Sequence, residues 1–302
     1  MLPIFPNISR LKLHHQNDIE KHIVQFHPYS DYNFTSMWAY NTEEIIEVFW
    51  LNKNLVVMFQ DYIDSKPFYS FLGTNQINKT IESLLNLSNQ NNLPLKLKLI
   101  PEVVVKHKEK VTDIFSVKED PDNFDYILSV QEIAELKGKK YYDKRNLINR
   151  FKRLYSGYVV KNIDLNNKSI QKEIFELFLL WSTQAKRTQE DYQTELEAIK
   201  RFLTFANQLH FYGIGIYFKN KMIGFSTYEL IHADYSIMSF EKGDRTFEGI
   251  YSVLNNEVAK HLSILKKKYI NYEQDLGIPG LKKAKSLWRP IFYLKKYIIS
   301  AK

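Results

Sequence analysis

The chain has 302 residues, which is long for a single hydrophobic core and suits two domains of roughly 150 residues each. Hydrophobic residues make up 44% and aromatic residues 15%, which excludes a disordered chain, and the absence of cysteine excludes disulfides, thiolate metal sites and a cysteine nucleophile. The net charge of +8 favours polyanionic partners such as tRNA, a nucleotide or an anionic membrane face, although a generally basic composition explains it equally well.

The start of the chain carries no targeting signal that we can identify. Residues 1–15 lack the apolar run of roughly 7 to 15 residues that a signal peptide requires. Elsewhere, no run approaches the roughly 18 apolar residues of a membrane span. We therefore expect a cytoplasmic protein without a transmembrane segment.

The first half of the sequence predicts a helix, a hairpin, a third strand, a second helix and a last strand. The loop of the hairpin is formed by Asn52, Lys53 and Asn54, which lie between two apolar runs. Gly73 ends the third strand, and alternating leucine and lysine predict the last one. The predicted elements span residues 19–26, 45–51, 55–60, 68–72, 77–87 and 95–99.

The second half repeats this order after two amphipathic helices. Its hairpin loop is formed by Lys219, Asn220 and Lys221 and is again rich in lysine and asparagine. The predicted elements are helices at 170–181, 196–209 and 250–265 and strands at 211–218, 222–230, 235–240 and 269–271.

The repeated order predicts an α+β fold built from two similar domains. Each domain would hold a mixed, mainly antiparallel sheet flanked by helices. We place the N-terminal domain at residues 1–138 and the C-terminal domain at 139–302, with the apolar segment 131–155 bridging them. Two unrelated lobes remain an alternative.

Common catalytic motifs are missing. Gly213 and Gly215 begin a G-x-G, but no third glycine follows and the segment is a predicted strand, which disfavours a dinucleotide site. No Walker loop, G-x-S-x-G or H-E-x-x-H is present, and the eight histidines are scattered, so we expect no metal site.

Three segments concentrate polar residues. In the first, residues 139–152, a helix would place Arg145, Asn149 and Lys152 on one face, where they could bind a phosphate. A solvated basic helix face is the more ordinary explanation.

The second segment, residues 239–249, leads from a strand into a helix that carries Tyr251 and Asn255. Such a loop offers backbone N–H groups and the positive end of the helix dipole to an anion. Asp244 and Glu248 would oppose a pyrophosphate there, and an ordinary acidic helix start is an equal alternative.

The third segment, residues 271–285, places carboxylates and amides at the end of a short strand, turns at Gly277 and begins a helix near Pro279. Lysines in the first turns of that helix are disfavoured by its dipole, which indicates that they bind an anion. A polar turn with surface lysines remains the alternative.

These segments also carry a family resemblance. The runs YYDKRNLINRF, FEKGDRTFEGIYSVLNNEVAKHL and above all YINYEQDLGIPGLKKAKSLWRP, with the earlier run SDYNFTSMWAY, resemble the bacterial DUF2156 family. That family has a tandem fold of two GNAT-like (acyl-CoA N-acyltransferase-like) domains and is grouped with the C-terminal catalytic domain of phosphatidylglycerol lysyltransferase.

The resemblance implies transfer of an acyl or aminoacyl group, with aminoacyl-tRNA as donor substrate and a lipid or another small molecule as acceptor. CoA is a weaker donor candidate, because the glycine-rich pyrophosphate loop of GNAT enzymes is missing near Gly243. The sequence departs from the family where Tyr272 and Lys282 replace arginines, and a membrane-spanning flippase part is absent.

The motif positions supply the candidate site residues. The candidate catalytic bases are Glu241, Glu273 and Asp275. The candidate substrate- and anion-binding residues are Arg145, Asn146, Asn149, Lys242, Tyr251, Asn255, Asn271, Gln274, Lys283 and Lys285.

Two other functions stay open at this point. A non-catalytic module that binds RNA, a nucleotide or an anionic lipid could use the same scaffold. An acetyl-CoA-dependent N-acetyltransferase is the second alternative. For the transferase, we expect the polar clusters near Arg145, Lys242 and Asp275 to converge on one hollow that accepts an anion.

Overall fold

The computed structural model describes residues 1–61, 64–107, 111–186, 188–231 and 234–302. The chain divides into two compact units that are interleaved along the sequence. Unit 1 comprises Met1–Tyr126, Gln274–Ala284 and Tyr293–Lys302, and unit 2 comprises Ile127–Glu273 and Lys285–Phe292. The sequence placed the boundary after residue 138, whereas the structural division first falls after Tyr126 and returns two C-terminal segments to unit 1.

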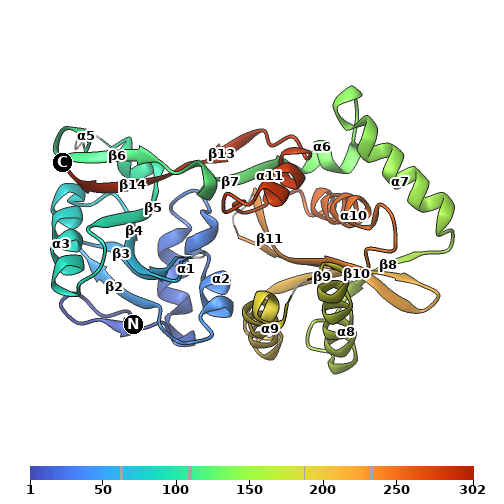
Figure 1. Ribbon diagram of the computed structural model, residues 1–302, viewed down its shortest axis with the longest axis horizontal. Helices are drawn as coiled ribbons and strands as arrows, with labels where there is room; N and C mark the ends of the chain where they lie inside the picture. The colour runs from blue at the N-terminus through green and yellow to red at the C-terminus, as the bar shows by residue number, and fades with distance from the viewer. Residues whose placement is uncertain (62–63, 108–110, 187, 232–233) are drawn as a thin grey trace. The chain divides into compact units, whose positions relative to one another are not determined.

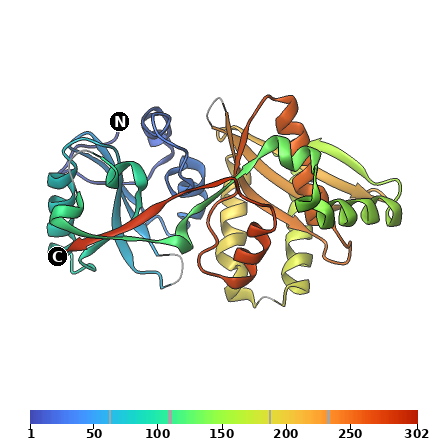
Figure 2. The ribbon, with the colours of Figure 1, turned by 90° about the horizontal axis from the view of Figure 1, so that it is seen from above.

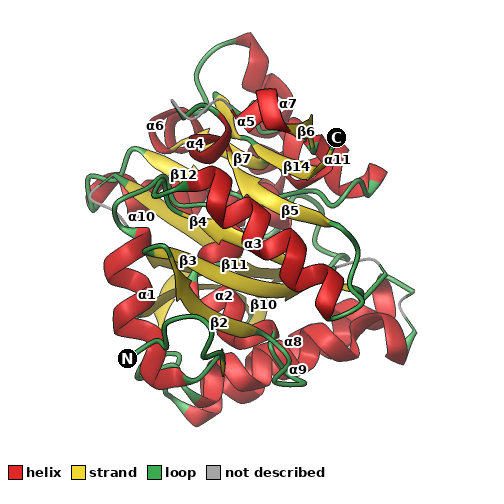
Figure 3. Cartoon of the chain, turned by 90° about the vertical axis from the view of Figure 1, so that its left-hand side faces the viewer, coloured by secondary structure: helices red, strands yellow, loops and turns green. Residues whose placement is uncertain are grey.

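Unit 1 begins with an antiparallel sheet of strand order β1-β2-β3-β4. Helix α3 lies across the strands of this unit (Figure 3), and Ile77, Ile81 and Leu84 on its inner face are fully buried. These elements are β1 (Ser9–Arg10), α1 (Gln16–Ile23), α2 (Phe34–Tyr40), β2 (Glu47–Leu51), β3 (Asn54–Gln60), β4 (Pro67–Leu72) and α3 (Ile77–Gln90), with short 3-10 turns at Leu13–His15 and Ser30–Tyr32.

A second sheet of unit 1 has the order β5-β14-β6 and contains the C-terminal strand (Figure 1). Strand β14 pairs antiparallel with both neighbours, so the last strand of the chain lies between two strands from its first half. The elements are β5 (Lys96–Pro101), α4 (Glu102–Val105), α5 (Val111–Ile114), β6 (Phe115–Glu119) and β14 (Lys296–Ala301), with a 3-10 turn at Pro121–Asn123.

Unit 2 is built on a sheet of order β13-β7-β12-β11-β10-β9-β8. Strands β8 to β11 are antiparallel neighbours, whereas β11 and β12 are parallel because α10 connects them. The strands are β7 (Asp125–Ser129), β8 (Val159–Ile163), β9 (Phe211–Phe218), β10 (Lys221–Leu230), β11 (Tyr235–Gly243), β12 (Tyr269–Asn271) and β13 (Phe292–Leu294).

Helices cover both faces of this sheet. Helix α10 lies on one face, and α8 and α9 lie on the other (Figures 1 and 2). The core on the α10 side includes Val253, Leu254 and Val258, which are fully buried. The helices are α6 (Val130–Glu135), α7 (Tyr142–Leu154), α8 (Lys168–Gln184), α9 (Gln189–Thr204), α10 (Ile250–Ile264) and α11 (Pro279–Ser286), with a 3-10 turn at Lys139–Tyr141.

The predicted α+β fold class is confirmed. Both predicted hairpins exist, and their two-residue turns place Asn52 and Lys53, and Lys219 and Asn220, at positive φ between 49° and 64°. Two-residue turns with both residues at positive φ match the twist of paired strands, and asparagine tolerates this conformation better than most residues. Among the described residues, no helix has both the length and the apolar run needed to cross a bilayer.

Candidate functional site

Glu241 lies near the end of β11 and is the centre of a polar cluster in unit 2. Asn255 of α10 donates from Nδ2 to both carboxylate oxygens of Glu241, at 3.0 and 2.8 Å. The hydroxyl of Tyr272, which follows β12, donates to Oε1 at 3.2 Å. The helix after β11 and the residue after β12 therefore bring two polar side chains, those of Asn255 and Tyr272, to one carboxylate.

The surroundings of Glu241 favour its neutral form more than water does. Burial raises its pKa from the ordinary value to about 7, against the opposing effect of the hydrogen bonds from Asn255 and Tyr272. Burial also raises the pKa of Tyr251 to about 12 and that of Tyr272 well above its ordinary range. Near neutral pH the two tyrosines thus keep their protons, while Glu241 can accept or release one.

The raised pKa of Glu241 predicts that the stability of the folded protein depends on pH. A raised carboxyl pKa means that the folded state binds more protons than the unfolded state between pH 4.5 and about 7. The free energy of unfolding should therefore fall with rising pH across this window, by up to roughly 3 kcal/mol, and Glu241→Gln should remove the fall. Urea denaturation of both proteins at a series of pH values measures the difference, and parallel curves would contradict the assignment.

Lys144 on α7 adds a positive charge beside this cluster. Burial lowers the pKa of Lys144, and the negative charge of Glu241 acts in the opposite direction. Its ammonium lies 4.1 Å from the centre of the Trp288 ring, which suits a cation-π contact. Lys144 was not among the predicted site residues, although its spacing from Ile148 and Phe151 places it on the buried face of the helix.

Lys285 contacts the same cluster through Tyr272. Its ammonium donates to the backbone carbonyl of Tyr272 and lies 5.1 Å from the centre of that ring. The lysine therefore fixes the backbone and the ring of the residue whose hydroxyl binds Glu241. Tyr251 also borders β11, because its hydroxyl accepts a hydrogen bond from the Gly243 N–H at 3.3 Å.

Lys242 points to the opposite face of the sheet from Glu241, as adjacent residues of a strand must. Its ammonium lies 2.7 Å from a carboxylate oxygen of Glu195 on α9 and 4.2 Å from the centre of the Trp181 ring on α8. The charge of this mostly buried lysine is thus paired within unit 2. The structure does not bring Lys242 to the cluster of Glu241 and Asn255.

The first polar segment has a structural role at Arg145. Its guanidinium donates to the carbonyl oxygens of Leu136 and, at 2.7 Å, of Gly138, so it ties the loop before α7 to the helix. Asn146 and Asn149 are exposed on α7. These three side chains do not join the polar cluster around Glu241.

The third polar segment divides between the two units. In unit 2, the side chain of buried Asn271 accepts a hydrogen bond from the N–H of Glu273 at 2.8 Å, and Glu273 itself adopts a left-handed backbone conformation. In unit 1, Asp275 is buried. Its carboxylate accepts hydrogen bonds from the Tyr126 hydroxyl and, at 2.8 Å, from the N–H of Gly277. Asp275 therefore holds a turn.

Gln274 joins a buried ionic network in unit 1. It accepts a hydrogen bond from the Ser30 hydroxyl at 2.7 Å and donates to Asp31 at 3.3 Å. Lys296 of β14 forms ion pairs with Asp31 and, at 2.7 Å, with Asp125, and all three charged side chains are fully buried. Ser30 and Asp31 from the run SDYNFTSMWAY and Gln274 from the run YINYEQDLGIPGLKKAKSLWRP thus meet in this network.

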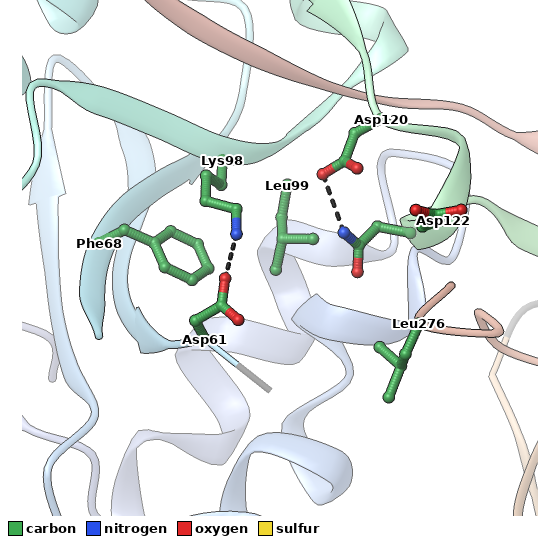
Figure 4. Close-up of a pocket in the computed structure, with 8 residues that line it drawn as sticks. Asp61, Phe68, Lys98, Leu99, Asp120, Asp122 and Leu276 are labelled. Atoms are coloured by element: carbon green, nitrogen blue, oxygen red, sulfur yellow. Dashed lines mark hydrogen bonds and ion pairs between the residues drawn. The ribbon is translucent and has the colours of Figure 1, made fainter. Parts of the chain in front are cut away.

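Unit 1 also contains a hollow of about 190 Å³. Lys98 pairs with Asp61 beside the Phe68 ring, and the side-chain amide of Asn123 donates to Asp120 at 2.8 Å (Figure 4). Among the described residues, its lining contains the carboxylates of Asp61, Asp120 and Asp122 but only one ammonium group, that of Lys98. None of the site residues predicted from the sequence is among these lining residues. The hollow is therefore unsuited to an anion.

Solved structures with a similar fold cover nearly the whole chain. A conserved protein of unknown function from Bacteroides thetaiotaomicron has a TM-score of 0.86 and 24% identity, with all of both chains covered. The C-terminal domain (DUF2156) of a putative lysylphosphatidylglycerol synthetase from Agrobacterium fabrum has a TM-score of 0.63 and 10% identity, covering 96% of this chain and 91% of that one. L-PGS from Bacillus licheniformis has a TM-score of 0.61 and 12% identity, covering 95% and 91%.

These likenesses show that the chain shares the fold of those domains, as the sequence runs implied. No curated protein matches the chain in sequence. The model of the protein family described as "Phosphatidylglycerol lysyltransferase, C-terminal" matches residues 24–300, which is nearly the full length. The chain therefore belongs to the phosphatidylglycerol lysyltransferase C-terminal family, a family of acyltransferase type.

Proposed function

We propose that this protein transfers an aminoacyl group from aminoacyl-tRNA to the hydroxyl of a lipid or another small acceptor, with Glu241 as the general base. The observation that carries the proposal is a carboxyl group with a pKa of about 7, held by Asn255 and Tyr272. A base whose pKa lies near the working pH combines a useful ionised fraction with enough basicity to remove a proton. Family membership supports the reaction class.

The proposed chemistry needs no further reactant. The acceptor oxygen forms a bond to the aminoacyl carbonyl carbon while its proton passes to Glu241. The bond between that carbon and the ribose oxygen of the tRNA then breaks, and the ribose oxygen takes the proton from Glu241. Lys144, close to Glu241, would stabilise negative charge that develops at the carbonyl oxygen.

Asn255 and Lys285, which the sequence predicted, and Tyr272, which it did not, have proposed roles in positioning the base. Asn255 and Tyr272 orient the carboxyl group of Glu241, and Lys285 holds Tyr272 in place. The net charge of +8 favours tRNA as the donor. We propose a cytoplasmic location, where charged tRNA is available.

Transfer can be measured directly. Purified protein is incubated with tRNA carrying a labelled amino acid and with vesicles of extracted lipids, and label is counted in the organic phase. We expect label to appear in the lipid fraction at a rate proportional to protein concentration. Salt-dependent RNA binding without transfer would contradict the proposal and favour a binding module. Thermal stabilisation by CoA with acetyl transfer would instead favour an N-acetyltransferase.

A further inference from the structure

Tyr251 lies in the first turn of α10, one helical turn before Asn255. Residues four apart share one side of a helix, and the amide of Asn255 donates both to Glu241 and, at 3.0 Å, to the backbone carbonyl of Tyr251. Besides burial, the charge of Glu241 raises the pKa of Tyr251, because the phenol lies close to the carboxylate. The side chain of Tyr251 is only partly buried, so a ligand that contacts Glu241 can also reach its hydroxyl.

The hydroxyl of Tyr251 accepts hydrogen bonds but, within the described residues, donates none. The Gly243 N–H donates to it at 3.3 Å. Burial raises the pKa of Tyr251, and a hydrogen bond from the Trp181 side chain, whose indole N–H can only donate, acts in the opposite direction. A phenolic hydroxyl has one proton to donate. The proton of Tyr251 therefore remains for an acceptor that comes from outside the chain.

Tyr155 provides an internal comparison on the loop between β11 and α10. Its hydroxyl also accepts a backbone N–H at 3.3 Å, that of Glu248, but it donates its own proton to the carbonyl of Thr246 at 3.4 Å. Both tyrosines thus hold this loop through a hydrogen bond of the same length. They differ because the proton of Tyr155 is used within the chain. Holding the loop therefore does not account for the unused proton of Tyr251.

We propose that Tyr251 is a second catalytic residue, whose hydroxyl donates a hydrogen bond to the carbonyl oxygen of the aminoacyl ester. The inference rests on the proposed transfer reaction and adds a residue to it. As the acceptor oxygen bonds to the carbonyl carbon, an electron pair of the C=O bond moves to its oxygen, and the Tyr251 hydroxyl stabilises that charge without losing its proton. The pair re-forms the C=O bond when the bond to the ribose oxygen breaks. A donor already held by Gly243 and Trp181 needs no reorganisation during the reaction.

Tyr251→Phe tests the proposal in the transfer assay with labelled aminoacyl-tRNA and vesicles of extracted lipids. We expect the single-turnover rate to fall roughly 10²- to 10³-fold, the usual cost of removing one hydrogen-bond donor from an oxyanion. The affinity for tRNA should not change, because the hydrogen bond strengthens only as charge develops on the carbonyl oxygen. The pH profile should also keep its position, because the hydrogen bonds to Glu241 come from Asn255 and Tyr272.

Tyr155→Phe is the matched control, since it removes a hydroxyl that accepts a backbone N–H of the same loop at the same distance. This variant should transfer label at nearly the rate of the unchanged protein, and circular dichroism should show both variants folded. An unchanged rate in Tyr251→Phe, or equal losses in the two variants, would overturn the inference. A shifted pH profile in Tyr251→Phe would also overturn it, since Tyr251 would then act through Glu241.

The unchanged protein separates this inference from the proposed function. In each of the contrary results above it still transfers label, so the proposed function survives and only the role of Tyr251 is rejected. Absence of transfer by the unchanged protein would instead reject the proposed function and the inference together.

Discussion

Glu241→Gln is expected to lower the rate of aminoacyl transfer by roughly 10²- to 10⁴-fold, the usual contribution of a general base. Glutamine keeps the size of the side chain and can still accept a hydrogen bond from Asn255, but it cannot take a proton from the acceptor. Donor binding should change little, because the reaction loses proton transfer and retains positioning. Single-turnover transfer of labelled amino acid, measured beside tRNA affinity, separates the two effects.

The neighbouring loop supplies a control for this substitution. Glu248 is an exposed carboxylate, 2.8 Å from Arg150, and Glu248→Gln makes the same chemical change without touching the cluster. Its transfer rate should equal that of the unchanged protein. Tyr272→Phe offers a second comparison, because loss of a hydrogen bond to the carboxylate should raise the pKa of Glu241 and shift the pH profile to higher values. Full activity in Glu241→Gln would exclude Glu241 as the base.

Lys296→Met is expected to destabilise unit 1 by about 3–5 kcal/mol. Burial alone lowers the pKa of Lys296, but the charges of Asp125 and Asp31 outweigh that effect and raise it above the ordinary value. Methionine fills a similar volume and leaves the two carboxylates buried without their cation. Because the raised lysine pKa contributes stability below its unfolded value, the full effect should be present at neutral pH.

The adjacent lysine serves as the control for this measurement. Lys295 pairs with Glu119 at 2.7 Å on the surface, where its side chain is 40% exposed. Lys295→Met should therefore change the free energy of unfolding by less than about 1 kcal/mol. Denaturant titration of both variants gives the comparison. Similar values for the two substitutions would show that the buried network does not stabilise unit 1.

The two hairpins could be predicted from sequence because their signals are local. Apolar runs of strand length flank Asn52 and Lys53 in one case and Lys219 and Asn220 in the other, and the structure places these residues in the turns. Strand β14 gave no comparable signal. Its partners lie roughly 180 to 200 residues earlier, and periodicity carries no information about which strands pair.

Part of the site could also be predicted from local sequence order. Glu241 and Asn255 lie on a strand and on the helix that follows it, so the local order brings them to one place. The grouping of Lys242 with Glu241 ignored strand alternation, which sends neighbouring side chains to opposite faces. Lys144 lies in the run YYDKRNLINRF that carries the family resemblance, but it was given no role. That run was examined for a phosphate-binding face at Arg145, Asn149 and Lys152, whereas the helical spacing of Lys144 from Ile148 indicated the buried face.

Gln274 and Asp275 illustrate a different limit. Carboxylates and amides after a strand resemble a catalytic loop whether they bind a substrate or another part of the chain. The partners of Gln274, Ser30 and Asp31, lie more than 240 residues earlier. Only tertiary structure reveals that the polar groups of this turn are occupied by hydrogen bonds within unit 1.

The central position of β14 also determines when unit 1 can be completed during synthesis. Until residues 296–301 leave the ribosome, the facing edges of β5 and β6 have no strand between them. The carboxylates of Asp31 and Asp125 also lack the ion pair with Lys296 until then. The second sheet of unit 1 is therefore completed only after the segments of unit 2 have been synthesised. Chains that lack residues 296–301 would expose both edges and be susceptible to aggregation and proteolysis.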